Sequence, residues 1–527
     1  MVSVIKRGAA PVDPQSGYVA THQVYASGGQ VWDAMMNQTD VGKNANKFYV
    51  IQLLHPIGNH SSIILITRWG RVGESGSQQV KGPFPPAAAV DEFKKQFKSK
   101  TSTAWEKRHG MTAKKGKYMW LERAFEDEEN DEDEDSAEAG PSGSKPESKA
   151  VIPKSTLAQE LQTVCRLIFN KSLIDAHLSS MNYDANKLPL GKLAKSTILN
   201  GFSALKSLSE VIADPAGAVA TEYGSYAAAC QELTNTYYSI IPHAFGRSRP
   251  TVISDMAILK KELELVDALG DMEVAQKLIQ TATPKDKHGN PVNPLDAQFL
   301  SLQLSNMEPI NADSQEFKAL NAYANDTHGV THSHMKINIQ HAYRVERESE
   351  TKAWHQGGHN KLEDGNRMLL WHGSRTTNFA GILRQGLRIA PPEAPVSGYM
   401  FGKGVYFADM VSKSAGYCHT HLSDGTGLLL LCEVAAKPFF EQENANYNAD
   451  KDCKANNKLC TLGLGQWRPE VWKDAGDALG NDALKGCVMP EGPAVQDPKH
   501  HSLWYNEYIV YDTSQIRLRY MIMFKTN

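Results

Sequence analysis

The spacing of hydrophobic residues changes twice along the chain, and the first stretch favours strands. Residues Lys47–Leu54 and Ser62–Trp69 are rich in β-branched and aromatic side chains, which is typical of strands. Gly58 and Asn59 lie between them and favour a turn. Residues 87–99 then place apolar side chains at helical spacing. We therefore predict a small β-rich module with one helix.

Residues 151–285 have the hydrophobic period of helices. Two apolar stripes predict a helical bundle, and both are typical of core packing rather than of a ligand site. Thr156 and Gln159 have the spacing of a capping box, which predicts the start of the first helix. The stripes consist of Leu157, Leu161, Val164, Cys165, Ile168 and Phe169, and of Ile258, Leu259, Leu263, Val266 and Leu269.

Short strand-like runs return after about residue 300 and predict a mixed α/β domain. Residues 440–500 are rich in Gly, Asn, Asp and Lys and predict a long loop, which in a compact domain is usually functional or mobile. We therefore expect a multidomain α+β protein. The candidate strands are Leu369–His372, Gly404–Ala408, Leu428–Val434, Tyr508–Tyr511 and Arg519–Phe524.

Charge is distributed unevenly along a chain whose formal net charge is only −3. Residues 1–124 contain 17 Lys and Arg against 8 Asp and Glu, an excess of 9 positive charges that suits a phosphate-binding surface or a solvated basic face. Residues 126–135 are acidic at nine of ten positions, and Gly, Ser and Pro dominate up to residue 150. This composition predicts a disordered linker between the first module and the rest.

Composition argues against several classes of protein. The seven cysteines are odd in number and form no CxxC pair, so neither a disulfide framework nor a zinc finger is expected, and Cys453 and Cys460 are interpreted as free thiols. No apolar run approaches the roughly 20 residues of a membrane helix. Gly398–Gly404 is one residue short of a P-loop, and no G-x-G-x-x-G follows a strand to open a helix. We therefore expect no metal, no membrane and neither common nucleotide cradle.

Four segments bear a dense similarity to one family. Trp371–Arg375, Phe401–Asp409, Ser412–Tyr417 and Tyr505–Tyr511 resemble the catalytic domain of the poly(ADP-ribose) polymerases. The match is dense over 366–435 and 503–512 and looser over 436–500. The helical region resembles the regulatory domain of that family, and the first module resembles its WGR domain. The segments that carry these two resemblances are Met181–Val211, Tyr237–Phe245 and Arg68–Gly73.

The resemblance implies a domain order that agrees with the hydrophobic pattern. It implies a β-rich WGR domain, an all-α regulatory domain and a mixed α/β catalytic domain, as in a short-form, DNA-dependent member of the family. The expected ranges are a flexible N-terminus at 1–22, a WGR domain at 23–125, a linker at 126–150, a regulatory domain at 151–285 and a catalytic domain at 300–527.

The resemblance also implies an NAD⁺ site built on His372, Tyr406 and Glu507. His372 would bond the adenosine-ribose 2′-hydroxyl, and Tyr406 would stack on nicotinamide together with Tyr417. Glu507 would stabilise the oxocarbenium-like transition state and orient an incoming hydroxyl. Further expected NAD⁺ contacts are Gly373 and Ser374 at the nicotinamide amide, Lys413 and Ser414 along the pocket, and Arg388 on the adenine-phosphate side.

For the WGR segment, the alternative is a small β-domain with Trp69 in its core. The resemblance implies instead that it binds a 5′-phosphorylated DNA end, with Trp69 stacking on an exposed sugar or base and Arg71 and Lys47 meeting phosphate. Weaker candidates for DNA contact are Asn44, Asn46 and Tyr118.

The function implied by the resemblance is poly(ADP-ribosyl)ation of protein acceptors, including the chain itself, and of growing poly(ADP-ribose), in response to nuclear DNA breaks. NAD⁺ is the expected substrate. Mono-ADP-ribosylation and a catalytically idle scaffold that binds breaks are the alternatives. Gly270 stands where the regulatory run of the family usually has a bulky apolar residue, and glycine weakens a helix interior. We therefore expect weaker autoinhibition than in a typical member.

Overall fold

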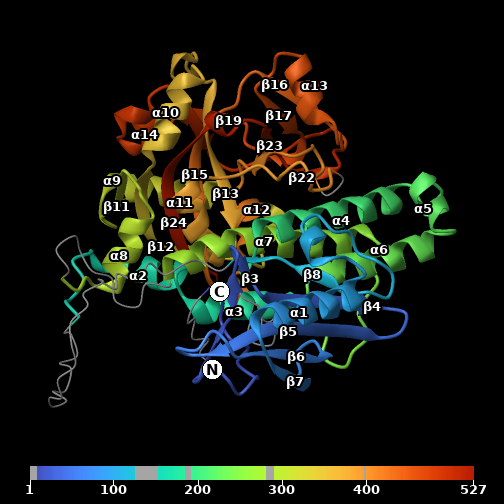
Figure 1. Ribbon diagram of the computed structural model, residues 1–527. Coiled ribbons are helices and arrows are strands. Elements are labelled where there is room, and N and C mark those ends of the chain that lie inside the picture. Colours follow the sequence, from blue (N-terminus) through green and yellow to red (C-terminus); the bar gives the residue numbers. More distant parts are fainter. Residues whose placement is uncertain (1–8, 125–151, 184–191, 280–289, 397–398, 527) are drawn as a thin grey trace. The chain divides into compact units, whose positions relative to one another are not determined.

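The computed structural model describes residues 9–124, 152–183, 192–279, 290–396 and 399–526 (Figure 1). The predicted linker at 126–150 and the side chains of 271–278 lie outside the described residues. The chain divides into two compact units, and the helical region contributes to both. One unit is Met1–Lys149, Leu178–Val266 and Pro392–Pro395, and the other is Ala150–His177, Asp267–Pro391 and Val396–Asn527.

An antiparallel sheet forms the centre of the first unit, in the order β7-β6-β5-β4-β8 with β1 paired to β5. Its two longest strands confirm the strands predicted around Lys47–Leu54 and Ser62–Trp69. The strands are β1 (His22–Val24), β4 (Asp33–Asp40), β5 (Ala45–Pro56), β6 (Ile63–Arg71), β7 (Ser77–Phe84) and β8 (Met119–Leu121), with a separate hairpin of β2 (Ala26–Ser27) and β3 (Gln30–Val31).

Helix α1 (Pro86–Thr101) covers one face of this sheet and confirms the predicted helix at 87–99. Its Phe93 and Phe97 pack with Trp105 against Ile51 and Leu53 of β5. Apolar residues of β5 and β6 on the other face pack with the N-terminal segment. Because both faces are covered, β5 is nearly continuously apolar rather than alternating.

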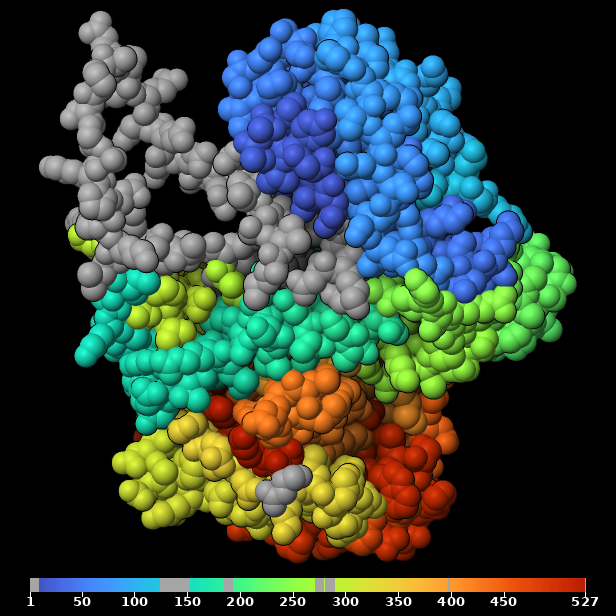
Figure 2. Space-filling view, turned by 90° about the horizontal axis from the view of Figure 1, so that it is seen from below, coloured from blue at the N-terminus to red at the C-terminus, as the bar shows by residue number. Residues whose placement is uncertain are grey.

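The helices of the first unit pack along the sheet through its strand β4. Asn37 donates from Nδ2 to the carbonyl oxygen of Tyr238 at 2.8 Å, and the Thr39 amide donates to Ser239 Oγ at 2.9 Å. In Figure 2, dark blue atoms of the N-terminal module adjoin green atoms of this helical part. The elements are β9 (Arg123–Ala124), β10 (Lys192–Leu193), α4 (Lys195–Ala213), α5 (Ala218–Glu222), α6 (Tyr226–Ile240) and the beginning of α7 (Met256–Ile279).

A seven-stranded sheet in the order β11-β12-β24-β15-β13-β20-β19 forms the centre of the second unit. Every residue of β15 is buried, as expected for an apolar central strand. The strands are β11 (Asn306–Pro309), β12 (Ile337–Glu346), β13 (Arg367–Ser374), β15 (Thr426–Ala435), β19 (Val471–Asp474), β20 (Cys487–Glu491) and β24 (Ile516–Thr526).

Two smaller sheets complete the second unit, in the orders β14-β23-β17-β16 and β21-β18-β22. Their strands are β14 (Val405–Phe407), β16 (Phe439–Gln442), β17 (Cys460–Gly463), β18 (Gly465–Arg468), β21 (Val495–Gln496), β22 (Leu503–Tyr505) and β23 (Glu507–Val510). The helices are α2 (Gln159–Ile168), α3 (Lys171–Ser180), α8 (Pro294–Ser301), α9 (Gln315–Asp326), α10 (Glu348–Gln356), α11 (Phe379–Gln385), α12 (Val411–Ala415), α13 (Ala449–Ala455) and α14 (Ala475–Leu479).

Two sequence-based expectations were wrong. Residues 440–500 are not a long loop, because they contain α13, α14 and five short strands from β17 to β21 that pair with distant segments. Thr156 does not cap α2, whose N-cap residue Ala158 makes no side-chain bond. Instead, Thr156 donates from its amide and its hydroxyl to Asp296 of α8 at 2.8 Å each.

Among the described residues, none of the helices combines the length and the hydropathy of a bilayer-spanning segment. No group of three or more His, Cys, Asp or Glu there is arranged to hold a metal ion.

Candidate active site

The predicted triad lies where two sheets of the second unit meet. Trp371 of β13 and Ala408, just after β14, form a backbone bridge in which each amide bonds the carbonyl of the other at 2.9 Å. Next to this bridge, β13 carries His372 and β14 carries Tyr406. Glu507 begins β23, which pairs with β14. The three residues come from separate parts of the sequence and converge at one junction.

His372 is held in a single neutral form. Its Nδ1–H donates to the carbonyl oxygen of Tyr406 at 2.9 Å, which leaves Nε2 with an open lone pair. Burial lowers the pKa of His372 below its usual 6.5, so the imidazole is uncharged at neutral pH. Its Nε2 is therefore an acceptor for a hydroxyl group.

Gly373 lies too close to its neighbours to carry a side chain. A Cβ there would stand 1.9 Å from the carbonyl oxygen of Ser414. The Ser414 hydroxyl is buried and donates to the carbonyl oxygen of Trp371 at 3.1 Å, so it supports β13 rather than facing the site openly. Ser374 accepts a bond from Asn378 Nδ2 at 3.0 Å. Glycine at this position therefore lets β13 pack directly against the backbone of Ser414.

The two tyrosines predicted to stack on nicotinamide differ in how firmly their rings are held. The Tyr406 hydroxyl donates to the carbonyl oxygen of Gly402 at 2.8 Å and accepts from the Phe401 amide at 3.0 Å, which fixes the ring. Burial raises the pKa of Tyr406, and the nearby Glu507 and Tyr417 raise it further. Tyr417 is 49% exposed. The ring of Tyr406 is therefore fixed, whereas the ring of Tyr417 is accessible to solvent.

Glu507 is paired with a buried lysine. Lys413 Nζ lies 2.8 Å from Glu507 Oε1 and donates to the carbonyl oxygen of Tyr505 at 2.9 Å. The side chains of Lys413 and Glu507 are only 15% and 14% exposed. Burial lowers the pKa of Lys413, and Glu507 opposes that shift. The pair holds the carboxylate at a defined position while one oxygen can face a substrate.

Arg388 faces a carboxylate of helix α7. It donates to Gln385 Oε1 at 3.2 Å, and the charge of Asp267 acts on it. The Asp267 carboxylate also hydrogen-bonds the Tyr399 side chain. A negative charge from α7 therefore stands on the side where the adenine-phosphate part of NAD⁺ was expected.

Comparison with known proteins decides the family. The chain matches three family models. They are the poly(ADP-ribose) polymerase catalytic domain over residues 314–526, the poly(ADP-ribose) polymerase regulatory domain over residues 155–299 and the WGR domain over residues 32–112. Poly [ADP-ribose] polymerase 2 of Zea mays is 39% identical over 99% of this chain and 75% of its own length. The protein of that name in Homo sapiens is 37% identical over 100% of this chain and 85% of its own length.

The chain belongs to the poly(ADP-ribose) polymerase family. It is therefore an NAD⁺ ADP-ribosyltransferase, and the resemblance drawn from the sequence is confirmed. The residues present suit the substrate of this family. Neutral His372 offers an acceptor for a ribose hydroxyl, and the fixed ring of Tyr406 offers a flat surface for an aromatic ligand.

Trp69 of the WGR domain forms part of an exposed aromatic surface. Its ring is 36% exposed and stacks on Tyr49, with 5.8 Å between centroids and an interplanar angle of 14°. Lys100 Nζ lies 4.5 Å from the centroid of Tyr49, and Tyr118 meets that ring edge-on at 5.6 Å. Trp69 is thus a supported surface residue, and Lys47 is also exposed.

Three other residues expected to contact DNA also form hydrogen bonds with the loop after α6. Arg71 donates from Nε to the carbonyl of Gly246 and from Nη2 to the carbonyl of Ser248 at 3.1 Å. Asn44 donates from Nδ2 to the carbonyl of Arg247 at 3.4 Å. Buried Asn46 donates to the carbonyl of His243 at 2.7 Å, so its amide does not face solvent. The sequence pattern missed this role because the partners lie about 170 to 200 residues away.

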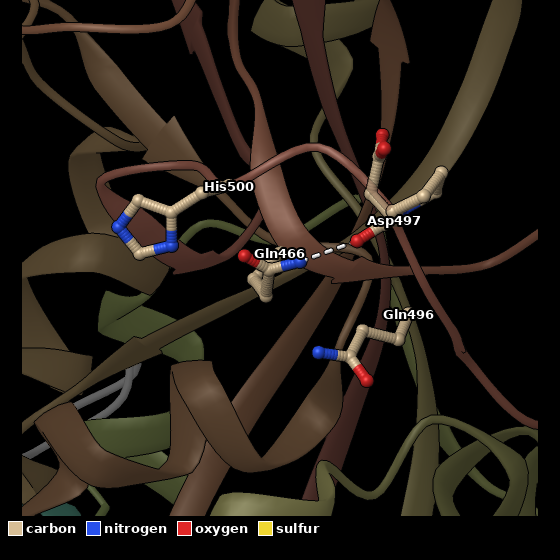
Figure 3. A pocket seen from close by; sticks show the side chains of 5 residues that line it. Gln466, Gln496, Asp497 and His500 are labelled. Atoms are coloured by element: carbon tan, nitrogen blue, oxygen red, sulfur yellow. Dashed lines mark hydrogen bonds between the residues drawn. The ribbon is translucent and has the colours of Figure 1, made fainter.

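A separate cavity of about 380 Å³ opens beside the sheet β21-β18-β22 (Figure 3). Gln466 lines it and donates from Nε2 to the Asp497 carbonyl at 2.5 Å. None of the predicted NAD⁺ contacts lines this cavity, so it is distinct from the triad. Its lining residues are Gln466, Gln496, Asp497, Pro498 and His500.

Proposed function

We propose that this chain is a poly(ADP-ribosyl)transferase that DNA breaks activate, and that it modifies proteins, including itself, during nuclear DNA repair. The observation that carries the catalytic part is the convergence of His372, Tyr406 and the Lys413–Glu507 pair at one sheet junction. His372 would hold the adenosine ribose of NAD⁺ and Glu507 the nicotinamide ribose. Tyr406 and Tyr417 would enclose the nicotinamide, and Gly373 and Ser374 would bind its amide.

The carboxylate of Glu507 would also support growth of the ADP-ribose polymer. Breaking the bond between nicotinamide and ribose develops positive charge at C1′, which Glu507 stabilises. The carboxylate also orients the attacking hydroxyl, and a hydroxyl of a previous ADP-ribose makes a polymer. Product size tests this directly. A high-molecular-weight smear of labelled ADP-ribose supports polymerisation, whereas one discrete modified band supports mono-ADP-ribosylation instead.

The exposed Trp69 ring on a basic module supports the DNA part of the proposal. Trp69 would stack on the terminal sugar or base of a 5′-phosphorylated break, with Lys47 near phosphate. A catalytically idle scaffold would use the same surface, but it would have no need of the neutral His372 and the paired Glu507.

The contacts of Arg71 offer a route from DNA to the catalytic domain. Arg71 holds the loop that contains His243, and His243 Nε2 bonds Glu262 of α7 at 2.9 Å. The same helix carries Asp267, whose charge faces Arg388. DNA binding at Trp69 would loosen α7 and withdraw this charge from the NAD⁺ phosphates, which is a shift between two populations.

Trp69→Ala and Arg71→Ala are expected to separate binding from activation. Losing one stacked base costs about 1–3 kcal/mol, so Trp69→Ala should weaken binding of a nicked duplex by roughly tenfold or more. Arg71→Ala should change affinity by less than about threefold but remove most of the stimulation, because its donors are used by Asn44, Gly246 and Ser248. Fluorescence anisotropy and nicotinamide release measure the two effects. Equal loss of affinity in both variants would contradict the separation.

Gly270→Ala is expected to strengthen autoinhibition. Gly270 lies inside α7, and a Cβ there would meet nothing within 4 Å. The substitution should therefore stabilise the helix by about 0.5–1 kcal/mol and lower DNA-independent nicotinamide release about two- to fivefold. Ser203→Ala in α4 is the control for helix propensity elsewhere. If neither the basal rate nor hydrogen exchange in α7 falls, the proposed weakness of this helix is wrong.

A further inference from the structure

A buried carboxylate outside the triad bonds the two residues on either side of Glu507. Asp409 follows the bridge at Ala408 and is 0% exposed. Its Oδ2 accepts from Asn506 Nδ2 at 2.8 Å and from the Tyr508 hydroxyl at 3.0 Å. Its Oδ1 has no hydrogen-bond partner among the described residues. A carboxylate held this way costs stability, which calls for a functional reason.

Asp409 is connected to Glu507 through the backbone. Asn506 directly precedes Glu507 and is 4% exposed. Its side chain is held at both ends, because Nδ2 donates to Asp409 and Oδ1 accepts from the Gly465 amide at 2.8 Å. The turn between β22 and β23, from which the Glu507 side chain departs, is therefore fixed by Asp409 and by β18.

Asp409 is also connected to Glu507 through charge. Lys413 follows Asp409 by four residues, and the charges of Glu507 and, to a smaller extent, of Asp409 raise the pKa of Lys413 against the lowering effect of burial. Burial alone would favour a neutral lysine, which could not orient Glu507 as strongly. The other titratable groups facing Asp409 are the hydroxyls of Tyr508 and Tyr323, which carry no charge at neutral pH.

We propose that Asp409 is a positioning residue for ADP-ribosyl transfer, which binds Asn506 and Tyr508 on either side of Glu507 and thereby holds Glu507 against the reacting ribose. Asp409 touches neither substrate nor Glu507 itself. This inference rests on the ADP-ribosyltransferase activity of the family and not on activation by DNA breaks.

Asp409→Ala in the full chain removes the acceptor that Asn506 and Tyr508 share, whereas the amide oxygen of Asp409→Asn can still accept from both. We expect kcat of Asp409→Ala for nicotinamide release, measured with nicked duplex present, to fall at least about tenfold, while KM for NAD⁺ changes less than about threefold. Asp409→Asn should restore kcat to within about threefold of the parent. Tyr508→Phe, which removes only one of the two hydrogen bonds, should also reduce kcat by less than about threefold.

A double-mutant cycle tests whether Asp409 acts through Asn506. If it does, Asp409→Ala should cost much less in an Asn506→Ala background than in the parent chain. The proposal is overturned if Asp409→Ala keeps the parent kcat, if Asp409→Asn loses as much activity as Asp409→Ala, or if the Asp409→Ala and Asn506→Ala substitutions are additive. A parent chain that releases no nicotinamide with or without DNA overturns the transferase assignment and this inference with it.

Discussion

Replacing Glu507 with glutamine is expected to lower kcat for nicotinamide release by roughly 10²–10⁴-fold. Glutamine keeps the size of the side chain and an oxygen that can accept from Lys413, which lies 2.8 Å from Glu507 Oε1. It lacks the negative charge that opposes the positive charge at C1′ in the transition state. The loss should therefore fall on kcat more than on KM for NAD⁺, because the carboxylate acts mainly in the transition state.

Glu470→Gln is the matched control, because Glu470 is exposed on the same domain and has no expected role in the site. Its activity should equal that of the parent. Steady-state nicotinamide release at varied NAD⁺, together with thermal unfolding of both variants, provides the comparison. A Glu507→Gln chain that retains more than about a tenth of the parental kcat would remove this carboxylate from the centre of the mechanism.

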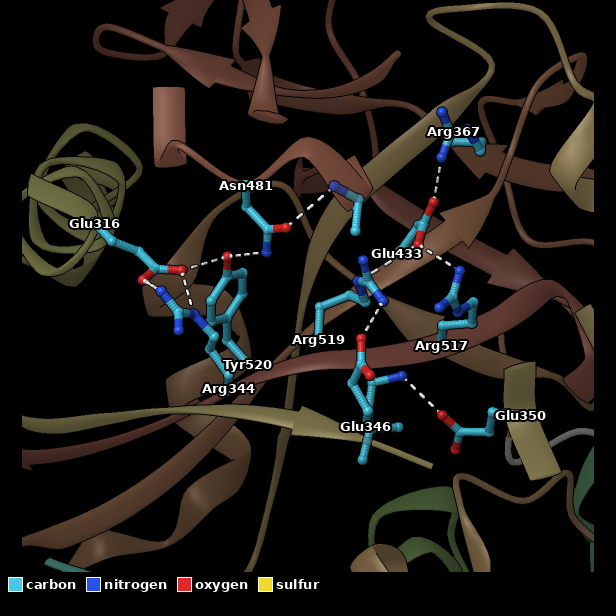
Figure 4. Close-up of polar contacts among 12 residues, drawn as sticks. Glu316, Arg344, Glu346, Glu350, Arg367, Glu433, Asn481, Arg517, Arg519 and Tyr520 are labelled. Carbon is cyan, nitrogen blue, oxygen red and sulfur yellow. Dashed lines mark hydrogen bonds and ion pairs between the residues drawn. The ribbon is translucent and has the colours of Figure 1, made fainter. Parts of the chain in front are cut away.

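Glu433→Ala is expected to lower the free energy of unfolding by about 3–5 kcal/mol. Glu433 is fully buried on β15 at the centre of an arginine cluster (Figure 4). Its Oε1 lies 2.5 Å from Arg367 Nη1, and its Oε2 lies 3.6 Å from both Arg517 Nη1 and Arg519 Nε. Removing the carboxylate leaves these guanidinium groups in a low-dielectric interior without their shared counter-charge.

Urea denaturation of the parent and the variant measures this effect. Glu363→Ala serves as the control, because Glu363 is exposed and its loss should change stability by less than about 0.5 kcal/mol. Glu433→Gln should fall between the two, since an amide oxygen can still accept from Arg367. Equal stability of the Glu433→Ala and Glu363→Ala chains would show that the cluster does not need its central carboxylate.

The triad could be expected from the sequence because His372, Tyr406 and Glu507 stand in short segments that resemble the catalytic domain of the family. The structure brings these segments together at one sheet junction. The long strands β5, β13 and β15 are visible in the hydrophobic pattern alone. The continuous apolar runs of these strands indicate that both of their faces are buried. Such a run can be recognised from residues that are neighbours in the sequence.

The contacts that connect distant segments could not be predicted in this way. Arg71 and Asn46 were expected to meet DNA, but their partners in the loop after α6 are set by the packing of α6 on β4. Glu433 interrupts an apolar strand, and only the cross-strand register that places Arg517 opposite it explains its presence there. The strands between 440 and 500 have two to five residues each, too few to show a period.

We propose that a DNA break switches on polymer synthesis by this chain. Incubation of the purified protein with labelled NAD⁺, with and without a nicked duplex carrying a 5′-phosphate, measures nicotinamide release and product size together. We expect the duplex to accelerate release and a high-molecular-weight smear to form, which the Glu507→Gln chain does not produce. Equal release with and without the duplex, or no release while the duplex remains bound, would contradict it.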